Sequence, residues 1–547
     1  MKNLLCGWGV WMMILLGNVA LAQNARPNII FILTDDQSVG YMGCDGNDIV
    51  QTPNLDQLAA EGLYFKQAYI TSGICTPSRV SMLLSQYERK HGVNFNSGTS
   101  VSEEAWEDAY PLVLRRNGYY TGWVGKNHAP VGQGGYTSGV MEQSFDYWYA
   151  GHRHLSFYPK KRHEIFKHAQ ANTQPEVLLE GALDFLSPNE QKLEGAIHFL
   201  EARPEDKPFC LSINFNLPHD AGSGTMRSLK DDDELYRTGY ADAEIPLPPN
   251  YVAKADIVTP KLPTDLLKVQ HRQVGYDYVD DPTSYRKRYT RHLQAMTGID
   301  RLVGRLRARL EELDLTDNTL IIFTSDHGLF GGQFGLGGKG LCYQQVTHVP
   351  LIIFDPSTAD ELPSHTTDAR VQSIDLAATL LTKAGIELPQ TYQGQDLSPI
   401  LAGGDESDGR EYIFTENLWS NHFGNPRCEA IQDGRWKYIR YYFNGTLGIH
   451  DKQAFAEDVG YGKVSPYGHD NPTTMITYRQ FAEGPLQGEP TVYEELYDLQ
   501  NDPAEAENLI DAKKHRKHLQ RLRDAWEQHL RQARGTEPPK VLALPNK

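Results

Sequence analysis

Short apolar runs recur along the chain, and segments with a helical pattern separate them. The runs are rich in Ile, Leu, Val and Phe and almost continuously apolar, which is typical of strands buried on both faces of a sheet. Their alternation with helices predicts an α/β fold, in which a large mixed, mostly parallel sheet is sandwiched by helices. We expect strands at residues 28–33, 209–215, 320–324 and 350–354, and helices at residues 55–61, 78–84, 112–117, 192–201, 285–313 and 373–384.

The pattern changes after about residue 403. Shorter strand-like segments follow, and Asp433-Gly434 between two of them predicts a hairpin turn. A long charged helix comes last. We therefore predict a larger domain at residues 23–405 and a smaller C-terminal α+β subdomain, built on an antiparallel sheet, at residues 406–547. The expected antiparallel strands are residues 412–415, 427–432 and 436–442, and the expected helix is 512–533.

The N-terminus has the pattern of an export signal. Lys2 precedes an apolar run at residues 4–16, and the small residues Ala20 and Ala22 follow. This order predicts a signal peptide at residues 1–22 that is cleaved after Ala22, and therefore a periplasmic or secreted protein. An uncleaved anchor is the alternative, although the run is short for a membrane span. We expect no stable membrane span elsewhere in the chain.

The charge and the cysteine content narrow the choice of partners. The chain has 53 Lys and Arg against 70 Asp and Glu, a net charge of −17. This balance argues against nucleic-acid binding, and an anionic substrate would need a local basic pocket. Six cysteines in 547 residues are too few for a disulfide scaffold. Cleavage of the signal would remove Cys6 and leave an odd number, namely Cys44, Cys75, Cys210, Cys342 and Cys428.

Carboxylates follow two of the predicted strands. Asp35 and Asp36 come directly after the first strand, and Asp326 and His327 follow the strand at residues 320–324. Ligands of open α/β sheets bind beyond the carboxyl ends of the strands, so these side chains are expected to meet. Adjacent carboxylates repel each other unless a cation lies between them, and oxygen ligands suit Ca²⁺ or Mg²⁺. A turn or helix cap is the alternative for Asp35-Asp36, and a loop carboxylate with a solvated histidine is the alternative for Asp326-His327.

A third group of polar residues opens a predicted helix. In Cys75-Thr76-Pro77-Ser78-Arg79 the Pro suits the first turn of a helix, which places Cys75 at its N-terminus. Backbone N–H groups there favour an anion, and Arg79 lies one turn further on. An ordinary structural cysteine is the alternative.

Basic side chains follow other predicted strands. Lys126 and His128 come after a short strand, His219 after the strand at residues 209–215, and Lys339 lies between two glycines. Lysine and histidine donors that converge on one point would neutralise an anionic group and supply a proton. Each residue taken alone is also compatible with an ordinary surface position.

These motifs together resemble the type I sulfatases of the alkaline phosphatase superfamily. Residues 75–79 resemble the maturation signature C-x-P-S-R, whose Cys a maturase, the formylglycine-generating enzyme, converts to formylglycine. The Asp35-Asp36 and Asp326-His327 pairs resemble the two metal pairs of the family, although Asp-Asn is common at the second pair. Residues 125–128 resemble its G-K-x-H segment, and residues 495–503 resemble a segment of its C-terminal subdomain. The resemblance implies an alkaline phosphatase-like fold and a C-terminal subdomain that contributes to the substrate pocket.

The resemblance also implies roles for the residues. Formylglycine made from Cys75 would be hydrated to a diol, attack sulfur and form a covalent sulfo-enzyme intermediate. His219 would protonate the leaving alcohol, and His128 would take the proton of the second hydroxyl. The metal ligands would be Asp35, Asp36, the residue at position 75, Asp326 and His327, holding Ca²⁺ or alternatively Mg²⁺, while Lys126 and Lys339 would contact the sulfate and Arg79 would orient residue 75.

The expected substrate is a sulfated carbohydrate, either a polysaccharide or an oligosaccharide. Polar and aromatic loop residues suit sugars that carry anionic groups. The candidate substrate-binding residues are His152, Arg153, His154, His422, Asn425 and Arg427. For each of them a polar surface loop is the alternative.

Three other functions stay open at this point. A phosphoester or phosphonate hydrolase of the same superfamily would release phosphate or a phosphonate instead of sulfate. An arylsulfatase would prefer small phenolic sulfates. A catalytically silent glycan-binding protein would keep Cys75 unmodified.

Overall fold

The computed structural model describes residues 26–93, 99–152, 182–183, 193–219, 233–263, 266, 277–418, 426–442, 482–537 and 541–543. The predicted signal at residues 1–22 lies outside this part of the chain. No helix among the described residues is long and apolar enough to cross a bilayer.

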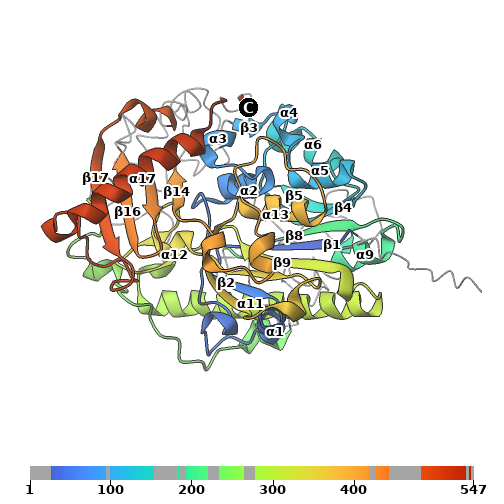
Figure 1. The fold of residues 1–547 in the computed structure, drawn as a ribbon. Helices are drawn as coiled ribbons and strands as arrows, with labels where there is room; N and C mark the ends of the chain where they lie inside the picture. The colour runs from blue at the N-terminus through green and yellow to red at the C-terminus, as the bar shows by residue number, and fades with distance from the viewer. Residues whose placement is uncertain are drawn as a thin grey trace, which may run out of the picture.

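An eight-stranded mixed sheet forms the centre of the larger domain (Figure 1). β9 and β1 lie in its middle and pair in parallel, and most other neighbours are also parallel. β12 is the exception, because it runs antiparallel to both of its neighbours. The strand order is β13 (Thr366–Gln372), β2 (Leu63–Tyr69), β12 (Leu351–Phe354), β9 (Thr319–Ser325), β1 (Asn28–Asp35), β8 (Phe209–Pro218), β4 (Tyr120–Asn127) and β5 (Tyr147–His152).

Helices cover both faces of this sheet, above and below it in Figure 1. The alternation of side chains along β1 explains the two layers. Ile30 and Ile32 enter one apolar core, whereas Ile29 and Phe31 enter the other. The first core contains α1 (Pro53–Glu61), α9 (Ala196–Ala202), α10 (Glu234–Thr238) and α11 (Pro282–Glu312), and the second contains α2 (Cys75–Leu84), α5 (Tyr110–Arg116), α13 (Asp375–Lys383) and α14 (Ser398–Leu401).

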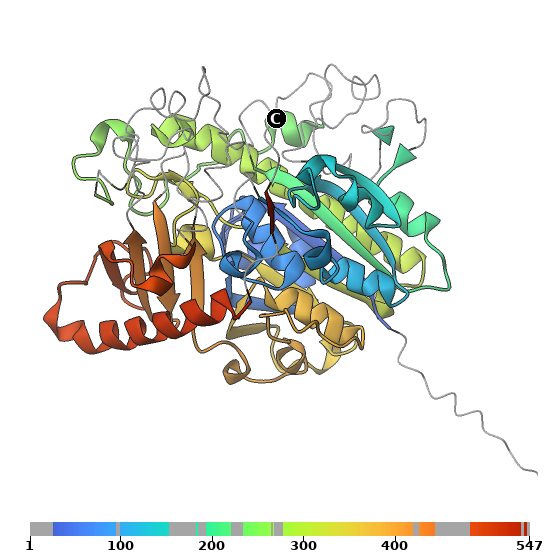
Figure 2. The same ribbon diagram turned by 90° about the horizontal axis from the view of Figure 1, so that it is seen from above.

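A four-stranded antiparallel sheet lies beside the larger domain (Figure 2). One face of it packs against α17 (Arg516–Arg534), which buries Leu519, Leu522 and Trp526. The other face packs against the segment that follows Lys339, including Leu341 and Tyr343. The strand order is β14 (Ile413–Asn417), β15 (Arg427–Gln432), β16 (Trp436–Tyr442) and β17 (Thr491–Asp498).

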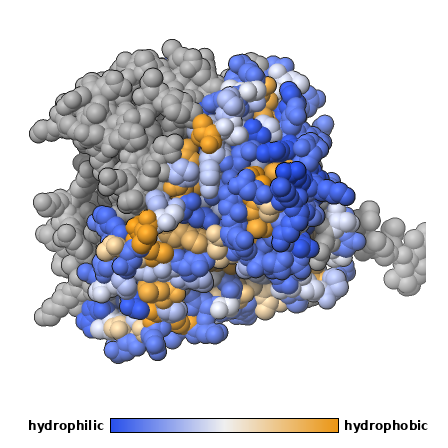
Figure 3. Space-filling model, turned by 90° about the vertical axis from the view of Figure 1, so that its left-hand side faces the viewer, coloured by the Kyte–Doolittle hydropathy of each residue, from blue (hydrophilic) through white to orange (hydrophobic). Residues whose placement is uncertain are grey.

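The side of the molecule on which β17 and α17 lie is mainly hydrophilic in Figure 3, with hydrophobic side chains in small separate groups.

The remaining elements are short. They are α3 (Glu88–His91), β3 (Thr99–Val101), α4 (Glu103–Trp106), α6 (Val140–Gln143), β6 (Ala182–Leu183), β7 (Leu193–Glu194), β10 (Phe330–Gly331), β11 (Gly337–Gly338), α12 (Gln344–Thr347) and β18 (Val541–Ala543), together with single-turn 3-10 helices.

The predicted fold class is confirmed, with differences at individual elements. The expected helix at residues 192–201 was partly wrong, because the chain forms β7 before α9 begins at Ala196. β2, β5 and β13 were not predicted. In β2 and β13, exposed positions such as Lys66 and Asp368 interrupt the apolar pattern of a buried strand.

Candidate active site

The first two candidate ligands lie where β1 ends. Asp35 is the last residue of the strand, and Asp36 follows in the left-handed region with φ 64°. Both side chains are buried. Burial raises the pKa of Asp35, but the charges of Lys126, His219 and Arg79 outweigh it and hold this pKa well below its usual range. Lys339 and His219 likewise outweigh burial at Asp36 and lower its pKa to about 2. Both carboxylates are therefore ionised at neutral pH.

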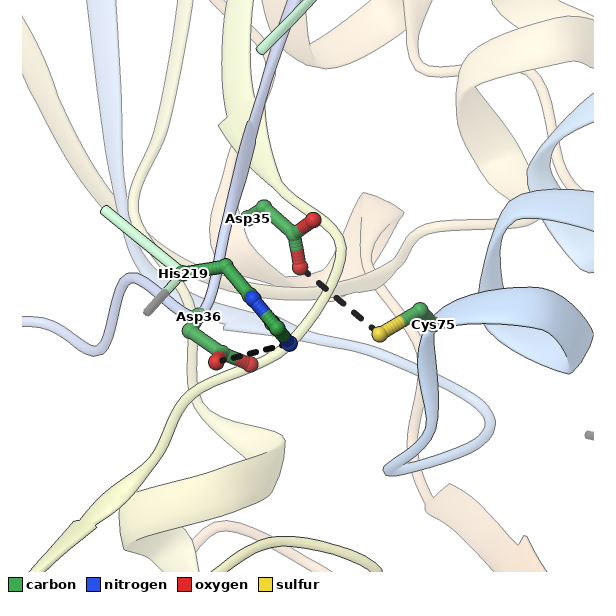
Figure 4. Close-up of side chains that lie close together, drawn as sticks. All are labelled: Asp35, Asp36, Cys75 and His219. Atoms are coloured by element: carbon green, nitrogen blue, oxygen red, sulfur yellow. Dashed lines mark hydrogen bonds and ion pairs between the residues drawn. The ribbon is translucent and has the colours of Figure 1, made fainter. Parts of the chain in front are cut away.

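Cys75 is the first residue of α2 and faces these carboxylates (Figure 4). Its Sγ lies 3.7 Å from Asp35 Oδ1, 3.1 Å from His327 Nε2 and 3.0 Å from Lys339 Nζ. Burial raises the pKa of the thiol to about 12, although Lys339 and Lys126 lower it. The unmodified side chain is therefore a neutral thiol and a weak nucleophile at pH 7.

Arg79 lies one turn after Cys75 and is buried. Its Nε donates to Asp326 Oδ2 at 2.8 Å, and its Nη2 lies 3.7 Å from Asp35 Oδ2. The same terminal nitrogen donates to the backbone carbonyls of Thr34 and Phe215, each at 3.4 Å. Arg79 therefore connects the ends of β1, β8 and β9 beneath Cys75.

Asp326 and His327 follow β9 and complete the cluster. The backbone N–H of Asp36 donates to Asp326 Oδ1 at 3.3 Å, and His327 Nδ1 lies 3.2 Å from Asp36 Oδ1. Burial lowers the pKa of His327, although Asp326 raises it, so the imidazole is neutral at pH 7. A neutral imidazole keeps a lone pair with which it can bind a metal.

The donor set fits a divalent cation. Two overlapping groups offer ligand atoms that lie within 4.8 Å of one another. Asp35 shares one group with Asp36 and the other with Asp326. Buried carboxylates this close repel each other, and a cation between them would relieve the repulsion. Oxygen ligands suit Ca²⁺ or Mg²⁺, whereas the imidazole is a less usual ligand for these ions. The first group is Asp35, Asp36, Cys75 and His219, and the second is Asp35, Cys75, Asp326 and His327.

Three of the predicted basic residues contact the cluster, and the fourth, His128, lies two residues after one of them. Lys126, at the end of β4, donates to Asp35 Oδ2, and Lys339 donates to Asp36 Oδ1 at 2.9 Å. His219 Nε2 lies 3.7 Å from Asp36 Oδ2 (Figure 4). His128 follows β4 directly and is buried, with its ring centroid 6.3 Å from that of Tyr136. The fold thus brings together residues from six places in the sequence, namely 35–36, 75–79, 126, 219, 326–327 and 339.

The predicted substrate-binding residues lie in different environments. His152, at the end of β5, contacts Glu142 Oε1 through Nε2 at 2.7 Å and Asn127 Nδ2 through Nδ1 at 2.9 Å. Arg427 is buried in β15, where it pairs with Glu489 and lies over the Tyr442 ring. Both side chains therefore have protein partners. Arg153, His154, His422 and Asn425 lie outside the described residues.

The structure adds two residues that the sequence did not single out for the site. Ser78 Oγ donates to the backbone carbonyl of Asp326 at 2.5 Å, and Asn214 Oδ1 lies 3.5 Å from Arg79 Nη1. Ser78 belongs to the quoted motif, so its position beside Arg79 was an available signal. Asn214 lies inside an apolar strand, and a buried polar residue there was the only sign of it.

Known protein families match this chain over most of its length. The family model described as Sulfatase matches residues 27–386, and a model described as N-sulphoglucosamine sulphohydrolase, C-terminal, matches residues 332–458. The N-acetylglucosamine-6-O-sulfatase of Bacteroides thetaiotaomicron is 27% identical over 483 residues, which cover 77% of this chain and 79% of that protein.

Solved structures share the fold at lower identity. A protein solved in complex with its substrate D-glucosamine-2-N,6-O-disulfate has a TM-score of 0.65 and 22% identity, covering 94% of this chain and 99% of that one. The phosphonate monoester hydrolase of Silicibacter pomeroyi has a TM-score of 0.64 and 22% identity, covering 92% and 95%. The same fold therefore carries more than one hydrolytic activity.

Proposed function

The chain belongs to the sulfatase family, and from this premise we propose that it is an exported enzyme that hydrolyses sulfate esters of a poly- or oligosaccharide. The observation that carries the proposal is the position of Cys75. Its Sγ lies 3.0 Å from Lys339 and 3.1 Å from His327, beside three buried carboxylates. The residue that would become the nucleophile therefore lies beside both a candidate cation site and the basic side chain of Lys339.

The names of the relatives favour a carbohydrate substrate. The Bacteroides relative is an N-acetylglucosamine-6-O-sulfatase, and human N-acetylglucosamine-6-sulfatase is 27% identical over 431 residues. An arylsulfatase of Clostridium perfringens is also similar, at 26% identity over 441 residues. The first of these relatives supports a sulfated amino sugar as the initial substrate to test.

The site residues of this chain support a division of work. Lys339 and Lys126 lie where their ammonium groups can hold the oxygens of a sulfate beside residue 75. His219 is slightly exposed and borders Asp36, which places it to give a proton to the leaving alcohol. Arg79 holds Asp326 in place. His128 is the proposed base for the second half of the reaction.

Two groups are implied that the chain must acquire. Formylglycine, made from Cys75 by a maturase, would supply a hydrated aldehyde as the nucleophile that takes up the sulfo group covalently. Ca²⁺ would be held by Asp35, Asp36, residue 75, Asp326 and His327, and would polarise the sulfate oxygens. Mg²⁺ is the alternative ion. The raised pKa of the unmodified thiol supports the need for conversion.

Export and the domain division complete the proposal. The signal pattern at residues 1–22 supports a periplasmic or secreted location. Residues 23–405 are proposed as the catalytic domain, and residues 406–547 as a subdomain beside the pocket. β15 packs against residues 341–343, which directly follow the site residue Lys339. This contact supports the placement of the subdomain beside the pocket.

The test is sulfate release from a panel of sulfated oligosaccharides and one aryl sulfate, after co-production with a formylglycine-generating enzyme. Cys75→Ala should keep the fold and lose turnover, whereas Cys44→Ala, a matched control outside the site, should retain it. Release from a glycan supports the proposal. Turnover of phosphonate or phosphate esters in place of sulfate esters, or sulfate release by Cys75→Ala at the wild-type rate, would overturn it.

A further inference from the structure

A buried arginine near the site has no anionic partner in the part of the chain that the structure describes. Arg288, in the first turns of α11, is only 7% exposed. Its Nε donates to His292 Nε2 at 3.1 Å, and its guanidinium lies 4.2 Å from the centroid of the Tyr278 ring. No carboxylate among the described residues lies within ion-pair distance of it. A guanidinium removed from water in this way normally has a carboxylate or another anion as its partner.

The neighbours of Arg288 do not neutralise its charge. His292 accepts the Nε–H bond through Nε2, so the imidazole carries no proton on that atom. Aromatic rings also lie close to these two residues. Tyr41 lies 5.5 Å from the His292 ring and 5.3 Å from the Tyr289 ring, and Tyr285 stacks on Tyr289 at 5.6 Å. The positive charge therefore faces aromatic rings, which attract it far less than an anion would.

Tyr278 connects this arginine to the segment that carries Lys339. The hydroxyl of Tyr278, whose ring lies under Arg288, is 3.4 Å from the backbone nitrogen of Gly338, the residue before Lys339. It also donates to the carbonyl of Phe330 at 3.1 Å. Tyr41 comes five residues after Asp36 along the chain. One aromatic ring and one backbone unit thus separate Arg288 from the lysine that contacts Cys75.

We propose that Arg288 binds a second anionic group, a carboxylate or a further sulfate, on the same sulfated carbohydrate whose ester is hydrolysed at residue 75. This inference rests on the proposed function and narrows its substrate to glycans with at least two anionic groups. The planar guanidinium can donate two parallel N–H bonds to either group. The partly exposed rings of Tyr41 and Tyr289 would lie against the apolar face of a sugar.

The test compares substrates that differ only in the second anion. The probes are N-acetylglucosamine 6-sulfate, glucosamine-2-N,6-O-disulfate, a uronic acid disaccharide of 6-sulfated glucosamine, and 4-nitrophenyl sulfate. In Arg288→Gln, kcat/KM on at least one dianionic glycan should fall at least about 30-fold more than on the two monoanionic probes, mainly through KM. Arg288→Lys should restore part of the loss. A larger loss on the disulfate identifies the second group as a sulfate, and a larger loss on the uronic acid disaccharide identifies it as a carboxylate.

The control is Arg301→Gln, an exposed arginine on the same helix that pairs with Asp233. Any change in kcat/KM that Arg301→Gln causes should be the same on every probe. Equal losses on every probe in Arg288→Gln, with unchanged melting temperature, would overturn the inference and leave the proposed function standing. Calorimetry of the dianionic glycans with the unconverted protein measures binding independently of sulfate release. It therefore distinguishes failure of the anion site from failure of the sulfatase activity. Binding that depends on Arg288 without any sulfate release would support the anion site and overturn the sulfatase activity, and absence of both would overturn both.

Discussion

At the scale of single residues, the site depends on buried charges that hold one another in place. Arg79 pairs with Asp326 and approaches Asp35, and all three side chains are almost fully buried. Breaking a buried ion pair by removing one partner costs about 3–5 kcal/mol, because the remaining charge has no compensation. The same residues therefore affect both stability and turnover.

Arg79→Lys should lower both the stability of the protein and its turnover. A lysine cannot donate in parallel to Asp326 and to the carbonyls of Thr34 and Phe215, so Asp326 would lose its fixed position. We expect kcat to fall about 100-fold or more, as for other losses of oriented groups, and the melting temperature to fall. Sulfate release and thermal unfolding measure the two effects. Arg531→Lys, in an exposed ion pair with Glu527, is the control and should change neither. Wild-type kcat in Arg79→Lys would contradict this role.

His91 should make stability depend on pH. The backbone N–H of Val93 donates to Nδ1 at 3.1 Å, and Ser81 Oγ lies 3.0 Å from Nε2, so the buried ring is held neutral. Burial lowers its pKa to about 3. Its contribution to stability is complete above the unfolded pKa of about 6.5 and is lost as pH falls toward 3, by about 1.4 kcal/mol per pH unit.

Thermal unfolding of wild type and His91→Gln between pH 4 and pH 8 measures this dependence. The slope of wild-type melting temperature against pH below about 6 should be steeper than that of His91→Gln, because glutamine does not titrate there. Parallel slopes for the two proteins would contradict the assignment.

At the scale of elements, α17 holds the small antiparallel sheet from outside. Trp526 is its main anchor, since the indole Nε1 donates to Glu429 Oε2 at 2.8 Å and the Arg440 guanidinium lies 3.7 Å from the ring centroid. Glu429 also pairs with Arg89 of α3, and α3 follows α2, the helix that begins at Cys75. The C-terminal helix is thereby connected to the region of Cys75 through three side chains.

Trp526→Ala should destabilise the protein by about 3–5 kcal/mol, the usual cost of removing a buried aromatic side chain. The exposed Gln528→Ala on the same helix serves as the control. Thermal unfolding followed by tryptophan fluorescence and by circular dichroism would report the change. If Trp526→Ala and Gln528→Ala melt together, α17 does not stabilise the sheet in this way.

At the scale of the whole molecule, the cation site joins the ends of separate strands. Asp35 ends β1 and Asp36 follows it, while Asp326 and His327 follow β9, so a bound ion would stabilise the folded chain but not the unfolded one. Ligand binding to the folded state alone stabilises it by about 2.7 kcal/mol when the ligand is at 100 times its Kd.

Chelation should therefore lower the melting temperature, and Ca²⁺ should restore it. In Asp36→Asn the shift caused by Ca²⁺ should be much smaller than in wild type, because one charged ligand is gone. Asp368→Asn, a half-exposed carboxylate outside the site, should keep the full shift. Differential scanning calorimetry with EDTA, CaCl₂ and MgCl₂ also tells which ion binds more strongly. No shift with either ion in wild type would contradict the metal site.

Local sequence was sufficient to predict the central strands, the long helix and the composition of the cluster. β1, β8 and β9 are almost continuously apolar because both faces of the sheet are covered, and that pattern is visible without a structure. The residues after these strands stood out because polar groups gather at the carboxyl ends of parallel strands. The motif around Cys75 added a resemblance that periodicity alone does not supply.

Only the tertiary structure decided which side chains meet. That Lys339 contacts Cys75, or that Arg427 pairs with Glu489, depends on segments that are tens to hundreds of residues apart. β2 and the edge strand β13 also needed the structure, because exposed polar positions interrupt their apolar pattern. The physical reason is that local propensity and periodicity act over a few residues, whereas burial and ion pairing depend on the packing of the entire chain.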